Sequence, residues 1–179
     1  MKTTALAAPA MILAALTATG CGANPATDHS RTAEGCAAAR FTAPYEQIDP
    51  CSAELVLQAA VAATFRYRPA DDPDPRAAFA RARPVVQDRF AEQADPAAAV
   101  WAPITTSQWQ RWRDQQTPVT TTVHITGDDH PPDTAATTDR VLAVRIQPAH
   151  EPAVAFTVYA NATRSPCGPW LLSGLGVQS

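Results

Sequence analysis

Large apolar residues recur at a helical spacing in the segment Asp49–Pro69, "DPCSAELVLQAAVAATFRYRP". Leu57, Val61 and Phe65 lie four positions apart, as on one face of an α-helix, and the other faces are mostly alanine. An aspartate followed by a proline is a typical helix start, and the proline at the end of the segment stops the pattern. This segment therefore predicts a helix that is buried on most of its sides.

The same aspartate-proline start recurs twice further along the chain and marks additional helices. The pattern predicts short helices over roughly residues 75–82, 84–93 and 96–100. Another helix, "TSQWQRWRDQQ", is expected from Thr106, and it places Trp109 and Trp112 three positions apart on one face. We expect these tryptophans, together with Trp170, to pack in the core.

Beyond Pro118 the apolar period changes to two, which is typical of β-strands with one buried face. Four segments show this alternation: "VTTTVHI", "RVLAVRI", "AVAFTVYA" and "WLLSGLGV". Turn-rich linkers such as "TGDDHPPDTAATTD" separate them. Helices followed by four antiparallel strands predict an α+β domain, with the N-terminal helices packed on a four-stranded antiparallel sheet.

A third pattern occupies the start of the chain. One cation, Lys2, precedes an apolar run over residues 5–19, which ends in small residues. A charged start, about 15 apolar residues and a small-residue exit predict a secretory signal that is too short to span a bilayer. The tetrapeptide "ATGC" at residues 18–21 resembles the bacterial lipobox. The resemblance implies that Cys21 is lipidated and holds the protein at the extracytoplasmic face of the cell membrane.

These patterns divide the chain into three parts. They are a lipoprotein signal peptide at residues 1–20, a lipid-anchored flexible tail at residues 21–48 and one α+β domain at residues 49–179. The tail begins with "ANPATDHSRTAE", which has no large apolar residue and is typical of a flexible spacer. Nearer the domain, Phe41, Tyr45 and Ile48 are able to pin the end of the tail onto it.

Composition and motifs argue against several functions. The chain has 14 basic and 17 acidic residues and a formal net charge of −3, so we expect no nucleic-acid partner. Its four histidines form no pair at helical or hairpin spacing, and we therefore expect no metal and no cofactor. Neither a glycine-flanked serine nor a glycine-rich loop before a helix is present in the sequence, and we assign no catalytic residue.

The order of the elements resembles that of a known family. The likeness is carried by "TFRYRPADDPDPRAAFARARPVV", "WQRW", "TPVTTTVHI", "HPPDTAATTDRVLAVRIQ" and "GPWLLSGLGV". These runs resemble nuclear transport factor and SnoaL-like proteins, and more narrowly the actinobacterial envelope lipoproteins that carry this domain near conjugative elements. The resemblance implies a cystatin-like cone with a curved sheet. A shorter likeness, of "DPCS", is to actinobacterial lipoproteins with an aspartate-proline-cysteine motif.

The resemblance implies two alternative functions. The first is a non-catalytic structural or accessory component of a cell-envelope assembly, in conjugation or secretion, which binds an envelope protein and forms homo-oligomers. The second is small-molecule binding, or isomerase or cyclase chemistry, in the pocket of the cone. SnoaL-like enzymes place an acid or a histidine there as the general base.

Three polar residues are the expected lining of such a pocket: His124, Arg145 and Tyr159, which share one face of the sheet. A histidine without an acid on a neighbouring strand is a weak general base, because nothing fixes its tautomer. We therefore favour the non-catalytic function and expect no enzymatic activity. An interior filled by alanine and tryptophan would favour a scaffold. A roomy pocket with His124 bonded to a carboxylate would favour an enzyme.

The remaining cysteines suggest one disulfide, since an exported domain meets oxidising conditions. With Cys21 acylated, Cys36, Cys51 and Cys167 remain. A Cys51–Cys167 bridge closes the longest loop and would contribute about 4 to 5 kcal/mol on the chain-entropy model, against about 3 for Cys36–Cys51. We predict Cys51–Cys167, with Cys36 left over. Cys36–Cys51 and Cys36–Cys167 are the alternatives.

Overall fold

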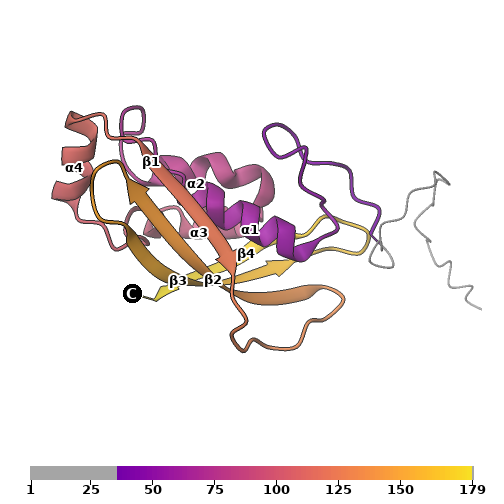
Figure 1. The fold of residues 1–179 in the computed structure, drawn as a ribbon. Coiled ribbons are helices and arrows are strands. Elements are labelled where there is room, and N and C mark those ends of the chain that lie inside the picture. Colours follow the sequence, from indigo (N-terminus) through magenta and orange to yellow (C-terminus); the bar gives the residue numbers. More distant parts are fainter. Residues whose placement is uncertain (1–35, 179) are drawn as a thin grey trace, which may run out of the picture.

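The computed structural model describes residues 36–178, which form an α+β domain with four α-helices and a four-stranded antiparallel sheet (Figure 1). The helices are α1 (Ala53–Thr64), α2 (Arg76–Ala82), α3 (Asp88–Ala94) and α4 (Thr106–Asp114), with 3-10 turns η1 (Arg83–Val85) and η2 (Ala97–Ala99). The strands are β1 (Val119–Ile125), β2 (Thr137–Pro148), β3 (Val154–Thr163) and β4 (Leu171–Gln178). The predicted α+β class is confirmed, and the sheet is open rather than closed into a barrel. Among the described residues, no helix has the length and apolar character needed to cross a bilayer.

Helix α1 is shorter at both ends than its sequence pattern predicts. Ser52 is the N-cap, and its hydroxyl accepts a hydrogen bond from the Leu55 amide at 3.4 Å. Asp49 instead accepts from the Cys51 amide at 2.9 Å, so it closes a turn before the helix. The helix ends at Thr64, ahead of Pro69, because the next four residues alternate between buried aromatic and exposed arginine side chains. Phe65 occupies the position that the helical spacing predicts, but it lies after the last residue of α1 and its backbone angles are not helical.

The helix predicted over residues 84–93 is divided into η1 and α3. Val86 between them is extended, with φ −119° and ψ 141°, and forms a β-bridge with Leu172. The Gln87 amide also donates to the Leu172 carbonyl at 2.9 Å. These bonds to the last strand replace helical bonds, which explains the interruption.

The four strands lie in chain order, β1-β2-β3-β4, and each is antiparallel to the next. In this register Val123 lies opposite Val144, and Val144 lies opposite Phe156. Since cross-strand partners share a face of the sheet, these apolar residues form one continuous surface. Helix α1 packs on that surface and contacts all four strands.

The core between the helices and the sheet is built from aliphatic, alanine and aromatic side chains. Trp109, Trp112 and Trp170 are all buried, which confirms their predicted core positions. The ring of Phe65, just after α1, meets Phe156 of β3 edge-to-face with centroids 5.0 Å apart. This edge-to-face contact joins the helical layer to the sheet.

Residues 36–48 belong to the folded domain and not to the predicted flexible tail, because they pack against its core. Tyr45 is buried, and Phe41 and Ile48 pack against the same cluster, in agreement with the anchoring expected of these three residues. The Tyr45 hydroxyl donates to the Arg81 carbonyl at 2.9 Å. The predicted signal peptide and the lipidation site Cys21 lie outside the described residues.

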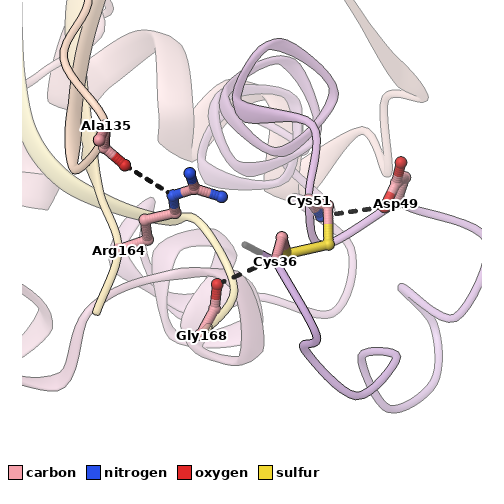
Figure 2. The surroundings of a disulfide bond; sticks show 6 residues. All are labelled: Cys36, Asp49, Cys51, Ala135, Arg164 and Gly168. Carbon is pink, nitrogen blue, oxygen red and sulfur yellow. Dashed lines mark hydrogen bonds between the residues drawn. A yellow bond between two sulfur atoms is a disulfide. The ribbon is translucent and has the colours of Figure 1, made fainter. Parts of the chain in front are cut away.

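The disulfide joins Cys36 to Cys51, with their Cα atoms 5.7 Å apart (Figure 2). The prediction of Cys51–Cys167, with Cys36 left over, is therefore wrong. Its premise is correct, since the helix start and the loop before β4 do share one end of the domain: the Trp170 amide donates to the Pro50 carbonyl at 2.9 Å. Cys36 also lies at this end of the domain, because its backbone forms a β-bridge with Cys167. There the Cys36 sulfur bonds to that of Cys51. Geometry thus outweighs the larger entropic benefit of the longer loop.

Candidate functional site: the outer face of the sheet

The three candidate site residues, His124, Arg145 and Tyr159, lie on the face of the sheet that points away from the helices. Neighbouring residues of a strand point to opposite faces, so Val123 and Val144 pack on the helices while His124 and Arg145 are exposed. Tyr159 shares this outer face and is 51% exposed. The expectation that His124, Arg145 and Tyr159 line the inside of a cone is thus corrected. The apolar strand residues, such as Val123 and Val144, face the helices because this orientation removes their side chains from water.

Two of these three residues line the same hollow on the outer face. Residues of β1, β2 and β3 enclose about 490 Å³ there, namely Thr122, His124, Ala143, Val144, Arg145, Ala155, Phe156 and Thr157. His124 lies opposite Ala143, and Thr122 lies opposite Arg145, which makes His124 and Arg145 diagonal neighbours on adjacent strands. Tyr159 lies beyond the hollow, where its hydroxyl donates to the Gln178 side chain at 3.0 Å. The structure therefore brings His124 and Arg145 together and leaves Tyr159 apart.

The hollow lacks the arrangement that general base catalysis needs. No acidic residue is among its lining residues, and within residues 36–178 no carboxylate bonds to His124. The Arg145 guanidinium donates to the Gln147 amide oxygen at 3.0 Å rather than to an acid. The described part of the chain also contains no cluster of three or more histidine, cysteine or acidic residues placed to hold a metal ion. What the hollow offers is a set of exposed hydrogen-bonding side chains on a rigid sheet.

The space between the sheet and the helices is filled by side chains. Trp112 is fully buried there, together with small residues such as Ala60 and Ala162. Interiors packed in this way leave little room for a substrate. The interior is therefore filled rather than roomy.

A charged cluster fixes the long β1–β2 loop to the helical side of the sheet. The Arg140 guanidinium, on β2, bonds to Asp133 of the loop at 2.7 Å and to Glu54 of α1 at 3.0 Å. The Thr138 hydroxyl donates to the same Asp133 carboxylate. The hydrogen bond from Arg140 is the main reason that the pKa of Asp133 falls to about 2, and the bond from Thr138 lowers it further. This cluster joins loop, strand and helix at one corner of the domain.

A second candidate site lies in the helical layer and was not predicted from the sequence. Arg66, Arg68 and Arg81 line a pocket beside Tyr45. One signal for it is present in the sequence: in "FRYR", the aromatic residues take the buried positions and both arginines take the exposed ones. The third arginine and the tyrosine come from distant segments, which only the fold brings together.

Comparison of the chain with protein-family models, with curated proteins and with solved structures finds no match. The likeness to nuclear transport factor and SnoaL-like proteins therefore stays a prediction from the sequence. The functional argument rests on the residues themselves and on their geometry.

Proposed function

We propose that this protein is a membrane-anchored extracytoplasmic lipoprotein, and that its domain is a cystatin-like cone acting as a non-catalytic component of a cell-envelope assembly. The assembly is of the kind that serves conjugation or secretion. One observation supports the non-catalytic part of the proposal: aliphatic, alanine and aromatic side chains fill the interior, while His124, Arg145 and Tyr159 are exposed on the outer face. Anchoring is supported by the apolar run at residues 5–19 and by Cys21 after its small residues.

The outer face of the sheet is the surface through which the domain binds another envelope protein. It combines flat alanine positions, Ala143 and Ala155, with donors and acceptors on Thr122 and Thr157. Exposed Tyr159 adds a large amphipathic ring beside them. Exposed aromatic residues beside polar side chains are characteristic of protein interfaces.

A second function, binding of a small molecule, is favoured by the hollow itself. Its volume of about 490 Å³ lies within the range of ligand pockets, about 300 to 1,000 Å³. The adjacent His124 and Arg145 would give such a ligand two polar contacts. Five of its eight lining residues are exposed, however, including His124 and Arg145, and an open surface suits a protein partner better than a buried ligand.

Site-specific photo-crosslinking in intact cells tests the proposal. A photo-reactive amino acid at Thr122 or Thr157, on the outer face, should give one discrete cross-linked product. The matched control positions are Gln93 on α3 and Gln110 on α4, which are also exposed but lie on the helical side. Substituting Ala143 by glutamate should abolish the product, because it places a charge at the centre of the contact. Equal cross-linking from both sides of the domain would contradict the proposal.

A further inference from the structure

A pocket of about 310 Å³ lies between the end of α1, the residue Arg81 of α2 and the segment that the disulfide closes. Its lining residues are Ala43, Pro44, Tyr45, Ala63, Arg66, Arg68, Arg81 and Pro84. Three of them are arginines, in a chain whose net charge is negative. None of the lining residues is acidic, so the charge of this pocket is opposite to that of the whole protein.

Two of the arginines are held outward by the burial of their neighbours. Phe65 and Tyr67 are buried in the core, whereas Arg66 and Arg68, which follow each of them, are exposed. Within residues 36–178, neither of the two guanidinium groups forms an ion pair or a side-chain hydrogen bond. Their donors are therefore available to a ligand in the pocket.

The third arginine is fixed in place by a buried acid. Asp72 is only 4% exposed, and its carboxylate accepts both guanidinium ends of Arg81, one of them at 2.9 Å. The same Arg81 group also donates to the Arg66 carbonyl at 2.8 Å, and the Arg68 amide donates to Asp72 at 2.9 Å. The bonds to Asp72 raise the pKa of Arg81. Arg81 and Asp72 thus hold the backbone from which Arg66 and Arg68 project.

The opposite wall of the pocket carries Tyr45. The Tyr45 hydroxyl donates to the Arg81 carbonyl at 2.9 Å, which fixes this wall against α2. Burial raises the pKa of this hydroxyl, and the charges of Arg66 and Arg81 act in the opposite direction. Arg81 is paired with Asp72, whereas the guanidinium groups of Arg66 and Arg68 form no ion pair within residues 36–178. The surplus positive charge therefore lies on the pocket side, because no lining residue is acidic.

We propose that this pocket binds a phosphate group, carried either by free phosphate and phosphomonoesters or by the phosphodiester of a lipid headgroup. The planar guanidinium group offers paired donors that match phosphate oxygens, and several oxygens on one ligand suit several arginines. The volume lies at the small end of the range for ligand pockets, which fits a headgroup-sized molecule. The Asp72–Arg81 pair and the Cys36–Cys51 disulfide hold the two walls before the ligand arrives, which favours binding.

Isothermal titration of the full-length protein in non-ionic detergent tests this site with three probes. They are inorganic phosphate, glycerophosphoglycerol, which is the soluble headgroup diester of an anionic lipid, and acetate. We expect saturable binding of at least one of the two phosphate probes, and at least 10-fold weaker binding of acetate. Binding of inorganic phosphate alone identifies the free ligand, and stronger binding of the diester identifies the lipid headgroup.

The variant pair R66A/R68A and R89A/R113A separates the pocket from general charge. Both variants remove two exposed arginines, but Arg89 and Arg113 lie on α3 and α4, outside the pocket. The first should weaken phosphate binding at least 10-fold, and the second should leave it within about 2-fold. Circular dichroism checks that both remain folded. The proposal is overturned if neither phosphate probe binds saturably, if acetate binds equally well, or if the two variants weaken binding equally.

Discussion

The cluster formed by Arg140, Asp133 and Glu54 makes a pH-dependent contribution to stability whose size can be worked out from the structure. In the folded chain the pKa of Asp133 falls from 3.8 to about 2, because Arg140 and then Thr138 donate hydrogen bonds to the carboxylate. A difference of this size between folded and unfolded chains corresponds to about 2.5 kcal/mol. The Asp133 side chain is 45% exposed, however, and screening by water reduces the expected contribution to about 1 kcal/mol.

The sign follows from the direction of the pKa change. Since the folded pKa is the lower one, the contribution is complete above about pH 4 and is lost as the pH falls through about 2. Asp133→Asn should therefore destabilise the domain by about 1 kcal/mol at pH 7 and have little effect near pH 2. Asp129→Asn, in the same loop, is the matched control, because Asp129 forms no ion pair within the described residues. Urea unfolding of the parent and both variants across this pH range measures the difference. A loss that stays constant down to pH 2, or no loss at pH 7, would refute the argument.

Three other predictions concern the core, the disulfide and the anchor. Trp170→Ala should lower the free energy of unfolding by about 3 to 5 kcal/mol, because its side chain is buried; a negligible change of melting temperature would contradict this. Cys36→Ser combined with Cys51→Ser should lower it by about 3 kcal/mol in urea unfolding, as expected for a loop of 15 residues, and an unchanged urea midpoint would contradict this. Cys21→Ser should release the protein from the membrane fraction or leave it unprocessed; unchanged fractionation and migration on a gel would contradict the lipobox prediction.

The period of the apolar residues was enough to find the strands. The segment "VTTTVHI" coincides with β1 at Val119–Ile125, and each of the other three predicted strands lies largely within an observed one. Strand signals of this kind depend on neighbours in sequence and on one buried face, which this sheet provides. The same local information could not identify the break at Val86, since its cause is a bridge to Leu172, at the far end of the chain.

The candidate site and the disulfide were harder to predict. Sequence spacing does not determine which face of the sheet is buried or which cysteines lie close together. The alternation of polar and apolar residues correctly placed His124 and Arg145 on one face of the sheet. The expectation that this face lines an inward pocket came from the family resemblance, and it conflicts with the burial of the apolar residues on the opposite face. For the disulfide, loop entropy ranked the possible benefits correctly, yet the position of Cys36 beside the start of α1 decided which sulfurs meet. Only spatial proximity, supplied by the fold, could settle either question.

The two candidate sites can be tested independently because they occupy different layers of the domain. The hollow with His124 is formed by strand residues that point away from the helices, whereas the arginine pocket is formed by the end of α1, by α2 and by the disulfide segment. Because the packed core separates them, exposed substitutions in one should leave the geometry of the other unchanged. The variant R66A/R68A should therefore lose phosphate binding and keep the outer-face cross-link, and Ala143→Glu should do the reverse. If each variant abolished both signals, the two surfaces would have to act as one site.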